Sequence, residues 1–361
     1  MVTVPTSVKL LFRMSDPSVP VITTIIPTYK RPKFLRRAIV SALAQTGPSL
    51  QVCVYDNASG DETSAIVAEF AAKDSRVKYF CHEKNIGGMA NFQYGLSHVI
   101  TQFFSFLSDD DVLLPGFYET AVRDFEEFPE AAFWCGVTIS MTSDGTFYTA
   151  RVADWPRTGL FTPPEGVLQM IKGSMPCWTS VLFRRRVIDQ VGPLNEQLQG
   201  PSDIEYLLRN ASRNPFIVSK HPGALFLLHP ESYSETSSLQ RVWPGWQGMM
   251  KSVSKADGLS DKDRHAIEQG MRSNAQRMLY RRGAAALAKK DYEFSGEAAG
   301  ILSEYFQNNF RSLILGGLTK ACVKVSFLQA LYSRAYRLAE RTLVYKRFSL
   351  RRKYGHFSRY L

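Results

Sequence analysis

The sequence lacks several patterns that would assign it to a familiar class. Its five cysteines are odd in number and scattered without a CxxC pair, which argues against a disulfide framework or a cysteine-rich zinc site and favours a reducing compartment. No apolar run approaches the roughly 18 residues that a membrane-spanning helix needs, and residues 1–20 hold no apolar run long enough for a secretory signal. The glycines of NIGGMAN (85–91) have neither the GxGxxG nor the GxxxxGK[ST] spacing, so they predict a turn into a helix, not a phosphate loop.

Acidic residues are almost absent from residues 311–361. This segment holds 12 Lys and Arg against one acid, Glu340, so it carries the whole net charge of +11 and residues 1–310 are formally neutral. Its apolar residues fall at helical spacing, at 318, 321, 325, 328, 332 and 335. A basic amphipathic helix is typical of proteins that lie on an anionic membrane surface. One alternative is that the stripe packs on the rest of the protein. Another is RNA binding through interleaved aromatic residues, but no recognised nucleic-acid module supports it and we expect no nucleic-acid partner.

Four short apolar runs alternate with helical patterns in the first 110 residues. The runs are 21–26, 50–56, 77–82 and 103–107, and helical patterns follow the first three of them. This alternation predicts an α/β fold with a doubly wound, mainly parallel sheet and helices on both faces. In such sheets ligands bind beyond the carboxyl ends of the strands.

The pattern changes after residue 131. We expect a hairpin turning near 144–145, a strand running into a short helix at 180–192, a helix at 202–211 and a last strand at 223–229. Residues beyond about 237 have long helical stretches and few strand signals. We therefore predict an N-terminal extension at 1–19, an α/β domain at 20–237 and a helical, basic C-terminal region at 238–361.

Carboxylates gather at two predicted strand ends. Asp56 ends the second strand, and Asp109, Asp110 and Asp111 follow the fourth. Neighbouring like charges raise the cost of ionisation, so the triplet calls for a cation from outside the chain. Mg²⁺ and Mn²⁺ prefer carboxylate oxygens and leave positions for phosphate oxygens, which would suit a nucleotide diphosphate. The alternative is that one aspartate caps a helix beginning at LLP, 113–115.

Six segments in this order resemble the family-2 inverting glycosyltransferases of the GT-A fold, of the kind that acts in bacterial polysaccharide and O-antigen assembly. The resemblance covers roughly residues 20–235, about 60% of the chain. The segments are IIPTYKRPKFLRRAIVSALAQT, VYDNASGDET, HEKNIGGMANFQYGL, FLSDDDVLLPGF, WTSVLFRRRVIDQVGPLNEQL and PSDIEYLLR.

The resemblance implies a nucleotide-binding set at the first two strand ends. Thr28 and Tyr29 match the family's base-binding turn, and Asp56 and Asn57 match the pair that contacts the nucleoside. The family more often has two acids at that pair, so Asn57 leaves the base open, with uridine and thymidine diphosphates ahead of guanosine.

The resemblance also implies a metal site for Mn²⁺ or Mg²⁺. The family's D-x-D-D register falls on Ser108 to Asp111, which puts Asp110 in the metal-binding place, Asp109 beside the ribose or the metal's waters, and Asp111 as a helping ligand. His229 matches a histidine that lies near the diphosphate or the metal, although a lone histidine at a strand end is often structural.

The general base implied by the resemblance is Asp203, in the segment SDIEYLLR. Inverting transfer needs one carboxylate to accept the acceptor's proton. The family's usual preceding Glu is Ser202 here. The alternative is that Asp203 caps the helix that follows. Glu205 is expected to pair with Arg209, four residues on, at the helix surface.

We therefore expect a metal-dependent glycosyltransferase that moves a sugar from a nucleotide-diphosphate donor to a lipid-linked or oligosaccharide acceptor. It would be cytoplasmic and peripheral on the inner face of the membrane. One rival is a sugar-phosphate nucleotidyltransferase, which should show a GxGTR-like loop where this chain has PTYKRP. The other is a non-catalytic nucleotide-binding or membrane scaffold, which Ser108 and Ser202 keep open.

Overall fold

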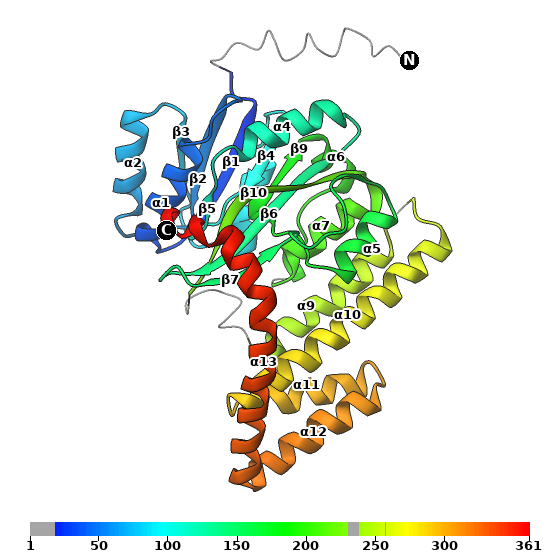
Figure 1. Ribbon diagram of the computed structural model, residues 1–361. Coiled ribbons are helices and arrows are strands. Elements are labelled where there is room, and N and C mark those ends of the chain that lie inside the picture. Colours follow the sequence, from blue (N-terminus) through cyan, green and yellow to red (C-terminus); the bar gives the residue numbers. More distant parts are fainter. Residues whose placement is uncertain (1–18, 199, 230–237, 257) are drawn as a thin grey trace.

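The chain builds one ten-stranded sheet with helices on both faces, and a layer of long helices extends below it (Figure 1). The computed structural model describes residues 19–198, 200–229, 238–256 and 258–361. Almost all of the predicted N-terminal extension, and the predicted domain boundary at 237, lie outside the described residues.

The sheet has the strand order β3-β2-β1-β4-β9-β6-β10-β5, with β7 added to β6 and β8 added to β10. Strands β1 to β4, β6 and β10 run in one direction, and β9 lies antiparallel between β4 and β6. The strands are β1 Ile22–Thr28, β2 Leu50–Asp56, β3 Val77–Cys81, β4 Phe103–Phe106, β5 Val112–Leu113, β6 Phe133–Thr142, β7 Phe147–Arg151, β8 Gly159–Phe161, β9 Val181–Arg184 and β10 Phe216–Leu228.

Each face of the sheet has its own apolar layer, because successive side chains of a strand point to opposite faces. In β2, Val52 and Val54 pack with one layer, whereas Cys53 and Tyr55 pack with the other. Each fully buried large apolar side chain contributes about 1.5–3 kcal/mol. One face is covered by α1 (Pro32–Leu43), α2 (Thr63–Lys73) and α4 (Phe117–Glu127), and the other by α3 (Gly88–Ser97), α5 (Glu165–Lys172), α6 (Arg186–Val191) and α7 (Ser202–Arg213).

The described C-terminal helices share the core of the sheet domain. Buried residues of α9 and α10 belong to the same cluster as those of α5 and α7. Side-chain caps start four of these helices, at Ser238, Ser260, Asp291 and Asn308, as expected for such residues. The helices are α9 Leu239–Ser254, α10 Asp261–Ala288, α11 Tyr292–Glu304, α12 Asn309–Lys324, α13 Ser326–Tyr354 and the 3₁₀ helix η3 Gly355–Tyr360.

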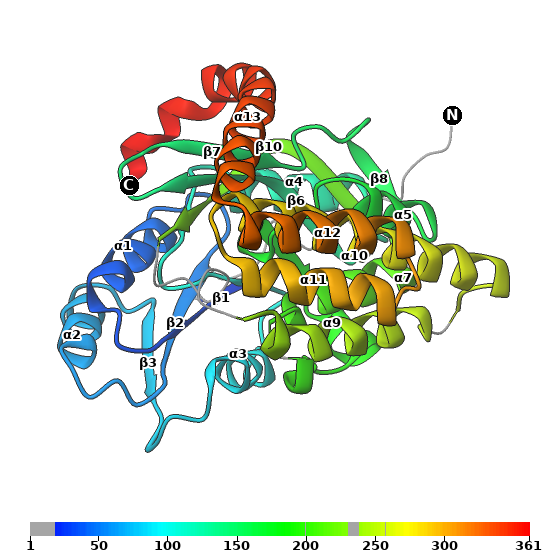
Figure 2. The ribbon, with the colours of Figure 1, turned by 90° about the horizontal axis from the view of Figure 1, so that it is seen from below.

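Helix α13 returns from the far end of the helical layer to the sheet (Figures 1 and 2). Tyr354 at its end is buried against an apolar cluster of β5, β6, β7 and β10, and Leu350, Phe357, Tyr360 and Leu361 pack around that cluster. The end of the described chain thereby lies beside α1, where Arg37 Nη1 donates to the main-chain oxygen of Leu361 at 3.1 Å.

Most predicted elements are confirmed, and two differ from the prediction in the sheet domain. The mainly parallel α/β sheet is present, and so are the hairpin of β6 and β7 and helices α6 and α7. Residues 113–115 start no helix, because Val112–Leu113 pair with β10 and α4 begins only after Gly116, whose φ is 78°. The last strand starts at Phe216, since the polar run Ser219–Pro222 conceals its first half in the sequence.

The predicted single amphipathic helix at 318–335 is in fact two helices. Val325 ends α12 with an extended φ of −128° and ψ of 101°, and α13 starts at the next residue. Among the described residues, no helix is both long enough and apolar enough to cross a membrane.

Candidate functional site

The carboxyl ends of β1, β2 and β4 bring the predicted site residues to one edge of the sheet. Thr28 is the register partner of Asp56 on the neighbouring parallel strand, and β4 flanks β1 on its other side. The Thr28 hydroxyl donates to Asp109 Oδ2 at 2.7 Å. All three side chains are buried. The predicted nucleotide-binding turn and the aspartate triplet are therefore in direct contact.

The predicted nucleoside residues form a polar group at the ends of β2 and β3. Asp56 accepts a hydrogen bond from the Tyr79 hydroxyl at 2.6 Å. The Asn57 amide donates to Asn85 Oδ1 at 3.0 Å. Tyr29 is exposed beside them, and its hydrogen bond with Asn85 lowers the pKa of its phenol. An aromatic ring with fixed carboxylate and amide partners suits the face and edge of a nucleobase.

The cation that the aspartate triplet requires comes in part from the chain itself. Arg31 Nη1 lies 2.9 Å from Asp110 Oδ2 and 3.4 Å from Asp109 Oδ1. Arg37 Nη2 donates to the main-chain oxygen of Asp110 at 3.0 Å. Burial, followed by the charge of Asp110, raises the pKa of Asp109 to about 6, while Arg31 and Thr28 oppose that rise. The expectation that the neutralising charge is wholly external is thus corrected.

Asp110 and His229 meet at the place where a divalent cation is expected. His229 Nε2 lies 2.9 Å from Asp110 Oδ2, and its ring stacks on Phe34 at 5.0 Å between centroids. A carboxylate oxygen and an imidazole nitrogen are both suitable ligands for Mn²⁺. Two protein ligands leave positions for phosphate oxygens and water. The donor set therefore fits a divalent cation that also holds a diphosphate.

Asp111 does not join this pair. The described residues contain no group of three or more His, Cys, Asp and Glu side chains that could hold a metal ion. Asp111 is fully buried, with Oδ2 accepting from the Thr179 hydroxyl at 2.7 Å and Oδ1 from the Leu227 N–H at 3.0 Å. Burial raises its pKa well above the usual value. These bonds fasten the motif to β10 and to the turn before β9, so the three predicted ligands do not form one set.

Asp203 lies in the first turn of α7, close to the same part of the molecule. The helix begins at Ser202, with Pro201 as its N-cap and without a side-chain cap. The alternative that Asp203 caps this helix is therefore wrong. Burial raises the pKa of Asp203, while the Ile204 N–H and the Arg151 guanidinium lower it. The charges of Asp111 and Asp203 both act on the buried Cys177 thiol, whose pKa burial raises to about 11.

Glu205 is paired with Arg209 as predicted, but the pair is not on the surface. Arg209 binds both carboxylate oxygens, at 2.8 and 3.1 Å, and the Glu205 side chain is completely buried. The Ser252 hydroxyl of α9 also donates to Glu205 at 2.5 Å. Glu205 thus joins two helices.

Sequence reasoning missed three arginines of this site. Arg31 directly follows the predicted strand-end pair Thr28–Tyr29, so the rule that placed those residues at the rim could have found it. Arg37 is on α1, six residues after Arg31, and its hydrogen bonds go to the main-chain oxygens of Asp110 and Leu361. No feature of the sequence around Arg151 could have indicated its place at the site, because it reaches the site through the pairing of β7 with β6.

Comparison with known proteins identifies similar sequences. The profile of the family described as Glycosyl transferase family 2 matches residues 23–192. An uncharacterized glycosyltransferase of Rickettsia typhi is 30% identical over 244 residues, which are 66% of this chain and 74% of that protein. The GalNAc(5)-diNAcBac-PP-undecaprenol beta-1,3-glucosyltransferase of Campylobacter jejuni is 34% identical over 109 residues, which are 30% of this chain and only 35% of that protein.

Solved structures with the same fold include TarS of S. aureus and a mannosyltransferase. TarS 1–349 of S. aureus in complex with UDP-GlcNAc superposes with a TM-score of 0.61 at 15% identity, over 84% of this chain and 91% of that one. The mannosyltransferase PcManGT of Pyrobaculum calidifontis, in complex with GDP-Man and Mn²⁺, gives 0.50 at 15% identity, over 88% and 94%. At these identities the likeness concerns the fold alone.

Proposed function

Because the chain belongs to glycosyl transferase family 2 and is a glycosyltransferase with a GT-A-like fold, we propose that it transfers a sugar from a nucleotide-diphosphate donor with inversion at the anomeric carbon. The observation that carries this proposal is the meeting of Thr28, Asp109, Asp110 and His229 at one edge of the sheet. Asp203 lies in the first turn of the nearby helix α7.

The donor nucleoside would lie against Tyr29, Asp56 and Asn57. The hydrogen bonds of Asp56 with Tyr79 and of Asn57 with Asn85 hold these side chains in fixed orientations before any ligand arrives. Preorganised polar groups lose less free energy when a ligand binds. The named ligands of the structural neighbours, UDP-GlcNAc and GDP-Man, support a sugar nucleotide, and we favour UDP or dTDP as its carrier.

The diphosphate would be held at Asp110 and His229 through Mn²⁺ or Mg²⁺. Such an ion, when bound, neutralises charge that develops on the leaving diphosphate. Arg31 is half-buried and already contacts Asp109 and Asp110, so it stands where it would pair with a phosphate as well. Asp111 would hold the loop in place through Thr179 and Leu227 and bind no ion itself.

Asp203 would take the proton of the acceptor hydroxyl as its oxygen forms the new bond to the anomeric carbon and the bond to the diphosphate breaks. General base catalysis of this kind contributes about 10²–10⁴-fold to a rate. Asp203 is partly buried, and its carboxyl pKa is raised by burial, which makes it a better proton acceptor than an ordinary aspartate.

The acceptor would be a lipid-linked saccharide, reached at the cytoplasmic face of a membrane. The printed name of the Campylobacter relative gives that protein an undecaprenol-linked substrate, and residues 311–361 of this chain carry the excess of basic charge. Polysaccharide or O-antigen assembly would be the setting.

The first test is calorimetric titration of UDP, dTDP and GDP into the purified protein, with and without Mn²⁺. One nucleotide should bind in a metal-dependent way, and Asp110→Asn should lose the metal-dependent part. His229→Gln should weaken it as well. Binding of one nucleotide that is equally tight with and without Mn²⁺ would refute the metal role, and binding of none would refute the donor site.

Asp203→Asn separates an enzyme from a non-catalytic scaffold. The variant should retain nucleotide binding by calorimetry and lose about 10²–10⁴-fold in transfer rate, because the amide cannot accept the proton. Wild-type protein that binds a sugar nucleotide but transfers nothing, with Asp203→Asn indistinguishable from it, would favour the scaffold. The nucleotidyltransferase alternative is set aside by family membership.

A further inference from the structure

In its first part, up to Leu338, helix α13 has polar side chains toward the protein and large apolar side chains toward solvent. On the inner face, Gln329 Nε2 donates to the main-chain oxygen of Leu287. The Tyr332 hydroxyl donates to the main-chain oxygen of Ala284, and the Ser333 hydroxyl donates to that of Ala288. These bonds, of 2.8–3.1 Å, hold α13 against α10. This is the reverse of an ordinary surface helix, which turns its apolar stripe toward the core.

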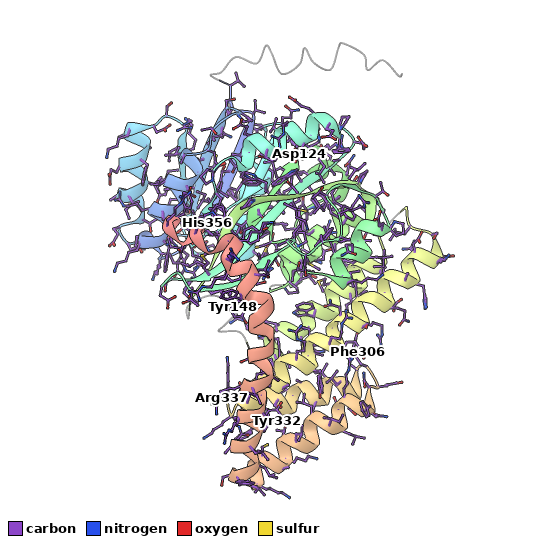
Figure 3. The ribbon with its side chains drawn as sticks, viewed as in Figure 1. Asp124, Tyr148, Phe306, Tyr332, Arg337 and His356 are labelled. Atoms are coloured by element: carbon purple, nitrogen blue, oxygen red, sulfur yellow. The ribbon has the colours of Figure 1, made fainter. Side chains whose placement is uncertain are left out.

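The outer face of α13 carries large apolar side chains in a line. Phe327 is 71% exposed, Leu331 53% and Leu338 64%. Their spacings of four and seven residues place them on one face of the helix. Arg334 is exposed within the same line, and Arg337 is exposed next to it. Figure 3 shows Tyr332 and Arg337 on this part of α13.

Helix α12 adds a second exposed apolar and basic face. Phe310 and Leu313, in its first turn and a half, are 75% and 73% exposed. Lys320 and Lys324 are exposed in its last two turns. The inner side of α12 is formed by Leu315, Thr319 and Cys322, all buried. The two helices meet at Val325, at the end of the molecule most distant from the sheet (Figure 1). We call the outer faces of α12 and α13 up to Leu338 the elbow surface.

We propose that the elbow surface docks on an anionic lipid bilayer. Water-exposed Phe and Leu in this density mark an interaction surface. Basic groups beside them add attraction to an anionic leaflet, and apolar groups enter the boundary between head groups and acyl chains. This proposal adds to the proposed function the surface through which the protein would reach the membrane. It is argued from the geometry of α12 and α13 and does not depend on the transfer chemistry.

A second copy of the chain fits this surface less well. Two elbow surfaces placed face to face would bring Lys320, Lys324 and Arg334 near their own equivalents. The described part of the elbow surface has no acidic side chain to neutralise them, since Glu340, the one acid of residues 311–361, follows it. An anionic lipid supplies that opposite charge over the whole area.

The test is sedimentation of the full chain with vesicles of phosphatidylcholine alone and of phosphatidylcholine with 30% phosphatidylglycerol. The apolar variant is Phe327→Ser with Leu331→Ser and Leu338→Ser. The charge variant is Lys320→Glu with Lys324→Glu and Arg334→Glu. The matched control is Ile100→Ser, because Ile100 is an 85% exposed apolar side chain of the sheet domain. Far-ultraviolet circular dichroism verifies that all variants are folded.

Wild type and Ile100→Ser should bind the anionic vesicles at least tenfold more tightly than the neutral ones. Both elbow variants should lose at least tenfold in that binding, with nucleotide binding unchanged. Equal binding by wild type and elbow variants would overturn the proposal, and so would failure of the wild type to bind. Concentration-dependent dimerisation abolished by the apolar variant, without vesicle binding, would assign the surface to a second copy. Nucleotide titration of the same samples reports separately on the donor site.

Discussion

Asp203 is under opposing influences, one of which a pH profile can isolate. Its burial disfavours the charged carboxylate and raises the carboxyl pKa, whereas the Ile204 N–H and the guanidinium of Arg151 lower it. Arg151 is itself held by the Phe226 ring, with 5.6 Å between the guanidinium carbon and the ring centroid. Since a general base must be deprotonated, the transfer rate should fall as the pH falls through the pKa of Asp203, which is above the ordinary value of about 3.9.

Arg151→Gln should move the acidic limb of kcat/KM to higher pH. The variant removes the positive charge that helps to lower the pKa of Asp203, so a larger share of Asp203 is protonated at a given acidic pH. Well above the limb the rate should approach that of the wild type. Arg151→Lys, which keeps the positive charge, is the control and should shift the limb less. An acidic limb that stays in place in Arg151→Gln would mean that Asp203 does not set it.

At this scale the sequence could predict residues at strand ends but not the directions of their side chains. Thr28, Asp56 and Asp109 come together because parallel strands end at one edge, which chain order alone indicates. That Asp111 turns away from Asp110 depends on Thr179 and on the Leu227 N–H, which are 68 and 116 residues distant. The catalytic and ligand-binding roles of these residues stay predictions until the titrations and Asp203→Asn are measured.

At the scale of elements, the buried carboxylate of Glu205 links α7 to α9. Glu205 accepts from Arg209 on its own helix and from Ser252 on α9. Glu205→Ala should lower the free energy of unfolding by about 3 kcal/mol, because removing one partner of a buried pair leaves the other uncompensated. Urea unfolding measures this change. The transfer rate at low temperature should be retained, since the proposed base is Asp203.

The exposed pair of Arg36 and Glu69 provides the control. Glu69→Ala removes the surface ion pairs with Arg36 and Lys73, which water and salt screen, so the urea midpoint should stay where it is in the wild type. If Glu205→Ala were as stable as Glu69→Ala, the buried pair would not hold α7 against α9.

Helices and strands whose apolar residues recur at one regular spacing could be predicted from the sequence. Elements that form through contacts with residues far away in the chain could not. β1 to β4 are short β-branched or aromatic runs and match their predictions closely. β5 has only two residues, and it is a strand because it pairs with β10 more than 100 residues later. The break between α12 and α13 was missed because the apolar stripe continues through Val325 in the sequence. The buried side of α12 instead includes Leu315 and Thr319, and the buried side of α13 beyond the break begins with Gln329.

At the scale of the molecule, residues 350–361 complete the sheet domain from the far end of the chain. Tyr354 is 2% exposed within the cluster of β5, β6, β7 and β10, and its hydroxyl has no hydrogen-bond partner among the described residues. Tyr354→Ala should weaken this docking by about 3 kcal/mol, as for other buried aromatic truncations. Amide hydrogen exchange in 350–361 should then be about 100-fold faster.

Tyr354→Phe is the matched variant. It keeps the buried ring and removes a hydroxyl that makes no bond, so the exchange rates should stay at the wild-type level or fall. Equal acceleration in both variants would mean that ring burial does not hold the segment.

The contact between Arg37 and Leu361 also sets an order of events during synthesis. The two residues are 324 positions apart, so a ribosome adding about 5–20 residues per second needs about 16–65 s to make the second after the first. During that time the apolar edge of β5, β6, β7 and β10 has no cover from residues 350–361. A nascent chain is therefore open to association with other chains at this apolar cluster until residues 350–361 have been made and have covered it.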